Sequence, residues 1–353
     1  MYLADLLFED NPWWLGNFEG KGWFPRIKKG GIILRIWAPY GRLGREHIMW
    51  FCQNWANENG EFSAFFFDLS RLEVIPDMLE EALRFYYTRI SFMGGKKIMV
   101  INSAHLIKEV EFIKDYMDED TTVILIYPIL VGDVDLRILR FNREEFGEIY
   151  EAFWDGDLEG FVLSLRKISA RVERAFWKYL VNFPQIWRFS RAIYDSINSI
   201  NEFYDIREKE FLRKFLNFVI TNHSKPFVYR DLAEGMDVRF ETIKSFMEHF
   251  FSGGISFEIS EIGSSPRSHR RIYLFSGGSY ASLTHMDKRR VLSMSQEELV
   301  SFFSIPELVS SAIERGFSVS FKDESAKVLI LSKGEKAISV NPYELPYYFV
   351  CAI

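Results

Sequence analysis

The fold is decided by the apolar run GIILRIW at residues 31–37 and by the turn APYGRLGRE at residues 38–46 that follows it. A short, continuous apolar run predicts a strand that is buried on both faces. Residues 46–57 then place Ile48, Phe51, Cys52 and Trp55 on one face, which predicts an amphipathic helix. The opening of the chain therefore predicts a strand, a glycine-containing turn and a helix in succession.

The same alternation continues to about residue 127. Further buried strands are predicted at FSAFFFD (62–68), KIMVI (97–101) and TVILIY (122–127). Helices are predicted between them, at residues 76–91 and 110–117. Alternating strands and helices predict an α/β domain with a parallel sheet, right-handed crossovers and helices on both faces.

The pattern changes after residue 150. Residues 150–220 are mostly helical. Three helices are then predicted at 211–222, 228–235 and 239–251, followed by strands at 255–262 and 271–275. Three helices and a hairpin predict a winged helix-turn-helix. The tail predicts a helix at 305–315 and strands at 318–322, 326–331 and 336–340.

Composition excludes several classes of protein. The chain has 353 residues and a net charge of −6, which argues against a globally basic nucleic-acid binder but not against a local basic patch. Cys52 and Cys351 have neither metal-site spacing nor a disulfide framework, which favours a reducing cytosol. The start lacks the pattern of a signal peptide, and no apolar run approaches 18 residues. We therefore expect a cytoplasmic protein without a membrane partner.

The turn after the first strand lies where a P-loop would hold phosphate. A working P-loop reads G-x-x-x-x-G-K-[ST], because backbone N–H groups and Lys bind phosphate and the hydroxyl binds Mg²⁺. Here Gly41 and Gly44 are present. At the correct spacing, the first Gly position of the motif holds Pro39; if Ala38 is taken as that position, the spacing is one residue too long. Arg45 stands at the Lys position and Glu46 at the hydroxyl position. A carboxylate there would repel phosphate.

The strand at 97–101 shows a second loss. In P-loop ATPases four apolar residues precede Asp-Glu, which supply the Mg²⁺-water ligand and the base that activates water. Here the run ends in Asn102-Ser103, followed by Ala104-His105. Neither an amide nor a serine hydroxyl replaces those carboxylates.

The tail shows a third loss. Nuclease-like domains that are joined to P-loop ATPases carry an acid and Asp on one strand and Glu-x-Lys on the next. The acids bind a divalent metal, and the Lys assists the attacking water. The matching segments are Ala326-Lys327-Val328 and residues 338–341, which read ISVN. No metal-binding residues and no catalytic residues are therefore predicted.

In order, spacing and local sequence the chain resembles the archaeal ATPase family that joins an AAA-type P-loop domain to a helical lid, a winged helix and a C-terminal nuclease-like domain. The resemblance covers most of the chain and includes the Asn-Pro-Trp-Trp start. It implies a degenerate nucleotide site at Gly41, Gly44, Arg45, Glu46, Asn102 and Ser103. The alternative for each motif is an ordinary turn that never bound anything. The implied fold is an N-terminal arm (1–29), a degenerate P-loop α/β domain (30–150), a helical lid (151–210), a winged helix (211–275) and a small α/β nuclease-like domain (276–353).

Local basic residues suggest a binding surface around the winged helix. The proposed contacts to nucleic acid or another partner are Arg239, Lys244, Arg267, His269, Arg270, Arg271, Lys288, Arg289 and Arg290. The alternative is a solvated hairpin tip, and acids on the predicted recognition helix disfavour sequence-specific reading. Trp13, Trp14 and Trp23 in the leader are either a docking arm for a partner or aromatics that pack on the P-loop domain.

We therefore expect a non-enzymatic binding or scaffold factor for a nucleic-acid or ribonucleoprotein partner, such as a ribosomal one, that needs no cofactor and bridges as a homodimer. A protein partner is an open alternative. Two further hypotheses are a nucleotide-sensing switch that binds without turnover and a winged-helix transcription regulator that binds DNA.

Overall fold

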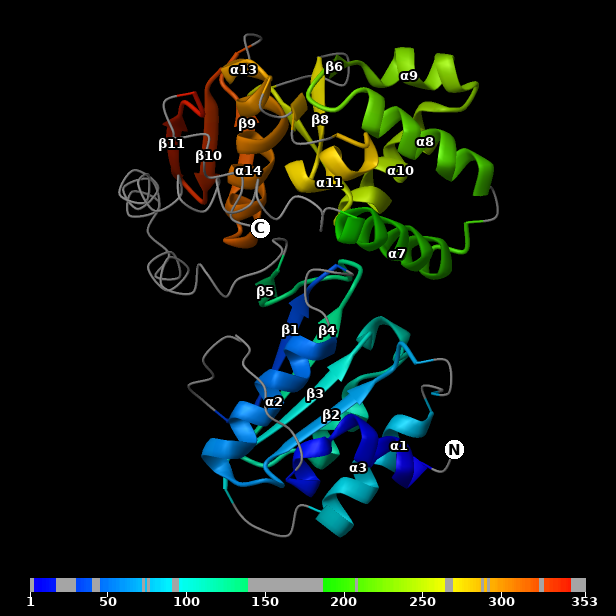
Figure 1. The fold of residues 1–353 in the computed structure, drawn as a ribbon, viewed down its shortest axis with the longest axis vertical. Helices are drawn as coiled ribbons and strands as arrows, with labels where there is room; N and C mark the ends of the chain where they lie inside the picture. The colour runs from blue at the N-terminus through cyan, green and yellow to red at the C-terminus, as the bar shows by residue number, and fades with distance from the viewer. Residues whose placement is uncertain are drawn as a thin grey trace. The chain divides into compact units, whose positions relative to one another are not determined.

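The computed structural model describes residues 3–16, 30–39, 45–71, 74, 77–90, 95–138, 187–206, 209–263, 269–286, 289–290, 293–323 and 327–343. The chain divides into two compact units. The first unit comprises Met1–Ala38 and Leu43–Ile138, and the second comprises Pro39–Arg42 and Leu139–Ile353. Each unit is described by itself (Figure 1).

The described part of the first unit holds a five-stranded parallel sheet in the order β2-β3-β4-β1-β5. The strands are β1 (Ile32–Trp37), β2 (Ala64–Asp68), β3 (Lys97–Asn102), β4 (Thr121–Tyr127) and β5 (Leu136–Arg137). The predicted α/β domain with a parallel sheet is confirmed, and the sheet is consistent with a Rossmann- or P-loop-like core. All residues of β2 and β4 are buried, as their continuous apolar runs predict.

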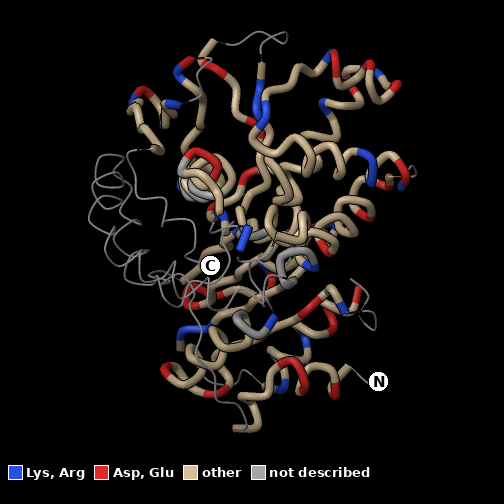
Figure 2. Tube along the Cα trace, turned by 45° about the horizontal axis from the view of Figure 1, so that its top comes forward, with Lys and Arg blue, Asp and Glu red and all other residues tan. Residues whose placement is uncertain are grey.

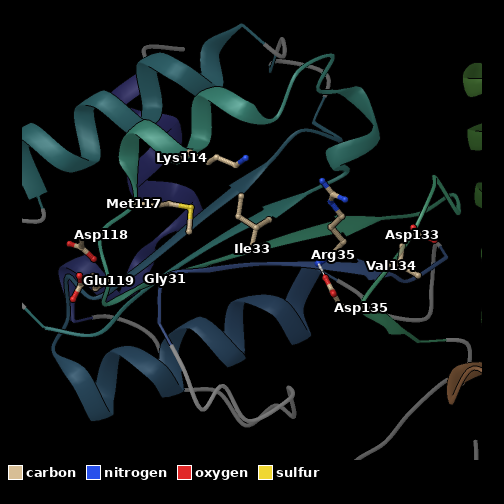
Figure 3. A pocket seen from close by; sticks show the side chains of 10 residues that line it. All are labelled: Gly31, Ile33, Arg35, Lys114, Met117, Asp118, Glu119, Asp133, Val134 and Asp135. Atoms are coloured by element: carbon tan, nitrogen blue, oxygen red, sulfur yellow. Dashed lines mark hydrogen bonds between the residues drawn. The ribbon is translucent and has the colours of Figure 1, made fainter.

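Helices cover this sheet on both faces, with α2 on one face and η4 on the other (Figure 3). Helix α2 (Arg45–Asn59) packs against β2 and β3, and α3 (Met78–Phe85) packs against η4. The helix expected at 76–91 is α3 followed by a π-helical turn, η2 (Tyr86–Ile90). The helix expected at 110–117 is η4 (Glu111–Tyr116), a 3₁₀ helix rather than an α-helix.

The leader is not the irregular segment that the sequence predicts. It forms α1 (Leu3–Asp10) and a 3₁₀ turn, η1 (Pro12–Leu15). The side-chain amide of Asn11 donates to Phe66 O at 3.0 Å and accepts from Phe66 N at 2.7 Å. Since β2 is the outer strand of the sheet, Asn11 pairs with its free edge as a neighbouring strand would.

Trp13 and Trp14 are 1% and 4% exposed and belong to the core of the first unit. Both indole N–H groups donate to Ala64 O, at 3.0 and 2.9 Å. The docking-arm interpretation is therefore wrong for these two residues, because their rings and polar atoms are used inside the fold. Trp23 lies outside the described residues.

The second unit begins with α7 (Trp187–Phe203) and α8 (Lys209–Thr221). Next come β6 (Pro226–Phe227), α9 (Tyr229–Met236), α10 (Phe240–Ser252), β7 (Ser256–Ser260) and β8 (Arg270–Leu274). The three strands form an antiparallel sheet in the order β6-β8-β7. Phe215, Ile243, Phe250 and Ile272 form the fully buried centre of the core between these helices and strands.

The tail adds α11 (Gly277–Leu283), α13 (Gln296–Leu299), the π-helical turn η7 (Val300–Ser304) and α14 (Ile305–Glu314). An antiparallel sheet follows, in the order β11-β10-β9, from β9 (Ser318–Phe321), β10 (Leu329–Lys333) and β11 (Lys336–Val340). The strand expected at 326–331 thus begins three residues later. In the described ranges no helix combines the length and apolar character that a membrane span requires.

A buried histidine joins the parts of the second unit. His223 is 1% exposed; its Nδ1 accepts from Leu274 N–H at 3.1 Å, and Nε2 lies 3.2 Å from Phe302 O. This pair of contacts requires the neutral ring with the proton on Nε2. Burial lowers the pKa of His223 to about 3.

The second unit is therefore expected to lose stability as pH falls from about 6.5 towards 3. The unfolded chain takes up a proton on His223 in this window and the folded chain does not, so the loss is about 1.4 kcal/mol per pH unit. Urea denaturation between pH 7 and 4 measures it. In His223→Gln, the slope of the unfolding free energy against pH should lose this contribution. Equal slopes in both proteins would contradict the assignment.

Candidate functional site: the carboxyl edge of the parallel sheet

The carboxyl ends of the parallel strands form the edge where α/β sheets bind ligands. The chain runs from β1 out to the edge strand β2, then returns through β3 and β4 and passes β1 to reach β5. The connections that leave the neighbouring strands β1 and β4 therefore run in opposite directions across the sheet, which reverses the strand order beside β1. The predicted nucleotide site belongs at this reversal. Gly41 and Gly44 lie outside the described residues. Arg45 and Glu46 begin α2, and the side chain of Glu46 also lies outside the described part.

Arg45, which the sequence predicts at the position of a P-loop lysine, is held by two carboxylates. Its Nη2 donates to Asp10 Oδ1 at 2.5 Å, and its Nε lies 3.6 Å from Asp68 Oδ2. The side chains of Asp10 and Asp68 are 0% and 3% exposed, whereas Arg45 is 39% exposed. A phosphate at this position would have to compete with two buried anions for one guanidinium group.

Asp10 is also bound by a second guanidinium group. Arg71 donates from Nη1 to Asp10 Oδ1 at 2.8 Å and from Nη2 to Glu9 Oε2 at 3.2 Å. Burial raises the pKa of Asp10 above its ordinary value, and the hydrogen bonds and charges of Arg45 and Arg71 offset part of that rise. The ion pairs of Asp10 join α1, the start of α2 and the segment after β2.

The residues at the ends of β2 and β3 bind each other rather than an open site. Asn102 donates from Nδ2 to Asp68 Oδ1 at 2.9 Å. The backbone N–H and hydroxyl of Ser70 donate to the same oxygen, at 3.1 and 2.7 Å. Asn102, predicted at the position of a magnesium-water ligand, is thus a hydrogen-bond donor that fixes Asp68.

Ser103 is the residue predicted to replace the catalytic glutamate of an active P-loop ATPase. It is fully buried and has a φ of 57°, in the left-handed region that non-glycine residues rarely adopt. A hydroxyl with no solvent exposure cannot present water to a phosphate. The arrangement around Asp10, Arg45, Asp68 and Asn102 therefore acts as a structural ion-pair network, which we call the edge network. We include Glu9, Ser70 and Arg71 in it.

The predicted basic surface is only partly present in the second unit. Arg270 donates from Nη1 to Glu258 Oε1 at 2.6 Å and stacks over Tyr229 at 5.0 Å, so it is a structural residue, contrary to its predicted role. Arg271 is half-buried and donates to Ser224 O at 2.8 Å. Lys244 pairs with Glu248 at 3.7 Å. The exposed members of the predicted set that remain are Arg239, His269, Arg289 and Arg290.

Arg267 and Lys288 lie outside the described residues. Along the described chain, acidic and basic segments alternate in each unit rather than forming one continuous basic band (Figure 2). In the tail, residues 338–340 lie in β11 and Lys327 lies two residues before β10, while Ala326 is outside the described ranges. Among the described residues no group of three His, Cys, Asp or Glu side chains is placed to hold a metal ion.

Five residues of the edge network were missed in the sequence: Glu9, Asp10, Asp68, Ser70 and Arg71. Asp68 had a usable signal, because it ends the apolar run FSAFFFD and so stands at the carboxyl end of a buried strand. Asp10 had none, because it lies 35 residues before Arg45 in a leader whose acids look solvated.

Comparison with known proteins gives no family for this chain. No family model matches it, and a search of curated proteins finds no matching sequence. The class of protein is therefore assigned from the structure alone. The first unit is an α/β domain with a five-stranded parallel sheet consistent with a Rossmann- or P-loop-like core, and internal ion pairs occupy the carboxyl edge of that sheet.

Proposed function

We propose that this chain is a non-catalytic binding factor, built on a P-loop-like scaffold, that engages a nucleic-acid or ribonucleoprotein partner and bridges as a homodimer. The edge network carries the proposal. Arg45 is committed to Asp10, Asn102 is committed to Asp68, and Ser103 is buried. The side chains at three positions that perform phosphate chemistry in P-loop ATPases thus stabilise the fold.

The second unit supports the binding part of the proposal. Its order of helix, short strand, two helices and hairpin, with the sheet order β6-β8-β7, supports a winged helix with α10 as the recognition helix. Glu241 and Glu248 are exposed on α10 beside Lys244. These acids favour contacts to the phosphate backbone or to protein over reading of base edges, which disfavours a sequence-specific transcription regulator.

Binding is expected to depend on the exposed cations Arg239 and Arg289. The double variant Arg239→Glu/Arg289→Glu should bind a labelled 30-nucleotide RNA at least tenfold more weakly, with a shallower dependence on salt. Fluorescence anisotropy at 50 and 200 mM salt measures both. Lys209→Glu/Arg213→Glu reverses two exposed charges on α8 and is the matched control. Equal losses in the control and the double variant would show a nonspecific effect of net charge.

The partner is tested by isolating the tagged protein from its own cell extract, with and without nuclease. Ribonucleoprotein components that are retained without nuclease and lost with it are the expected result. Partners that remain after nuclease treatment would make the interaction a protein contact and remove the nucleic-acid proposal. Light scattering of the purified protein tests the dimer.

A further inference from the structure

A groove of about 750 Å³ lies in the first unit, away from the edge network. Its floor is formed by Ile33 and Arg35 on β1 (Figure 3). One wall is formed by Lys114 of η4 and by Met117, the residue after η4. The other wall is formed by residues 133–135, before β5. The volume is within the range of ligand sites, about 300–1,000 Å³.

The groove exists because the connection from β4 to β5 contains no helix. Residues 128–135 cross from Tyr127 to Leu136 without helix or strand, and η4 is a short 3₁₀ helix on this face. The first half of β1 therefore has a half-exposed or exposed face, unlike the fully buried β2 and β4.

Among the described residues, none pairs with the outer edge of the first half of β1, beside the groove. On that side Arg35 O accepts from Asp135 N at 2.9 Å and Trp37 O accepts from Ile138 N at 2.7 Å. Alternate residues of a strand direct their N–H and C=O groups to the same side, so those of Ile33 also point there. β5 pairs only with Ile36 and Trp37, and no described segment pairs with Ile33 on this side.

Two cations inside the groove have no ionic partner in the described part of the chain. Arg35 and Lys114 are exposed, and neither side chain forms an ion pair with the residues that the structure describes. Their side chains extend into the same space (Figure 3). Acids stand at the two ends of the groove, with Asp118 and Glu119 at one end and Asp133 and Asp135 at the other.

We propose that this groove binds an extended peptide segment of a partner protein, with a single acidic residue at its centre. The peptide pairs with the free N–H and C=O of Ile33 as an added strand, and its acidic side chain lies between Arg35 and Lys114. The strand from Gly31 to Arg35 spans about 13 Å, which suits four or five extended residues. The acids at both ends of the groove disfavour any further negative charge in the peptide.

The test is selection of a random seven-residue peptide library, displayed on phage, against the full-length protein. Enriched sequences should carry one central Asp or Glu between apolar or neutral residues. A selected peptide, labelled with fluorescein, should bind Arg35→Ala and Lys114→Ala at least tenfold more weakly. Lys108→Ala removes an exposed cation of the same unit that does not line the groove, and should bind normally.

Strand pairing is tested separately with Ile33→Pro, which removes the N–H that points away from β4 and no N–H that β4 uses. The affinity of Ile33→Pro for the selected peptide should fall at least tenfold, while its circular dichroism spectrum is retained. If this variant does not fold, Arg35→Ala and Lys114→Ala still decide whether the groove binds the peptide. No enrichment, or unchanged affinity in Arg35→Ala and Lys114→Ala, would overturn the proposal. Succinate binding as tightly as the peptide would make the groove a site for small anions and would also overturn it.

Discussion

Replacing Asp10 with Asn is expected to lower the free energy of unfolding of the first unit by about 3 kcal/mol, because the partly buried guanidinium groups of Arg45 and Arg71 lose the charge that compensates them. Asp10 has no solvent exposure, and Arg45 and Arg71 both donate to its Oδ1. The isosteric amide keeps the volume of the side chain but removes its charge. The measurement is urea denaturation followed by circular dichroism, with the two units fitted as separate transitions.

Glu9→Gln is the matched control. Glu9 is the neighbouring acid, also pairs with Arg71, and is 56% exposed, so its loss should cost less than about 1 kcal/mol. A cycle with Arg45→Met checks the assignment further, since Asp10→Asn should cost less when Arg45 is absent. If Asp10→Asn and Glu9→Gln cost the same, Asp10 does not hold the edge network together.

Trp13→Ala is expected to destabilise the first unit by about 3–5 kcal/mol. The substitution empties the space of a fully buried indole and leaves Ala64 O with one donor instead of two. Thermal and urea denaturation should both show the loss. Leu15→Ala, in the same turn but 57% exposed, should be nearly neutral. A stable Trp13→Ala protein that loses a binding partner would restore the docking-arm interpretation.

Much of the first unit could be predicted because its strands are long apolar runs. The runs that contain β1 to β4 need burial on both faces, and only a sheet covered by helices provides it. β5 and β6 were missed because two-residue strands have no periodicity. α1 was missed because its eight residues end in two acids and precede Asn-Pro-Trp-Trp, which looks like a turn.

The contacts at the candidate site could not be predicted from the sequence. The loss of phosphate chemistry at Arg45, Asn102 and Ser103 stays a prediction, made from their positions along the sequence. The partners of Arg45 come from α1 and from the end of β2, so only the folded chain brings them together. Arg270 was misjudged because a basic residue in a hairpin looks exposed, whereas Glu258 and Tyr229 hold it inside the second unit. The winged helix and the nuclease-like domain stay predictions.

The central claim is that the edge network replaces nucleotide binding, and calorimetric titration with ATP tests it most directly. The titration is made with millimolar nucleotide, with and without Mg²⁺, alongside an assay of phosphate release. We expect only the heat of dilution and no release of phosphate above the buffer control, because Arg45 is held by Asp10 and Asp68. Saturable binding of ATP, with or without hydrolysis, would contradict the account and favour the nucleotide-sensing switch or a working ATPase.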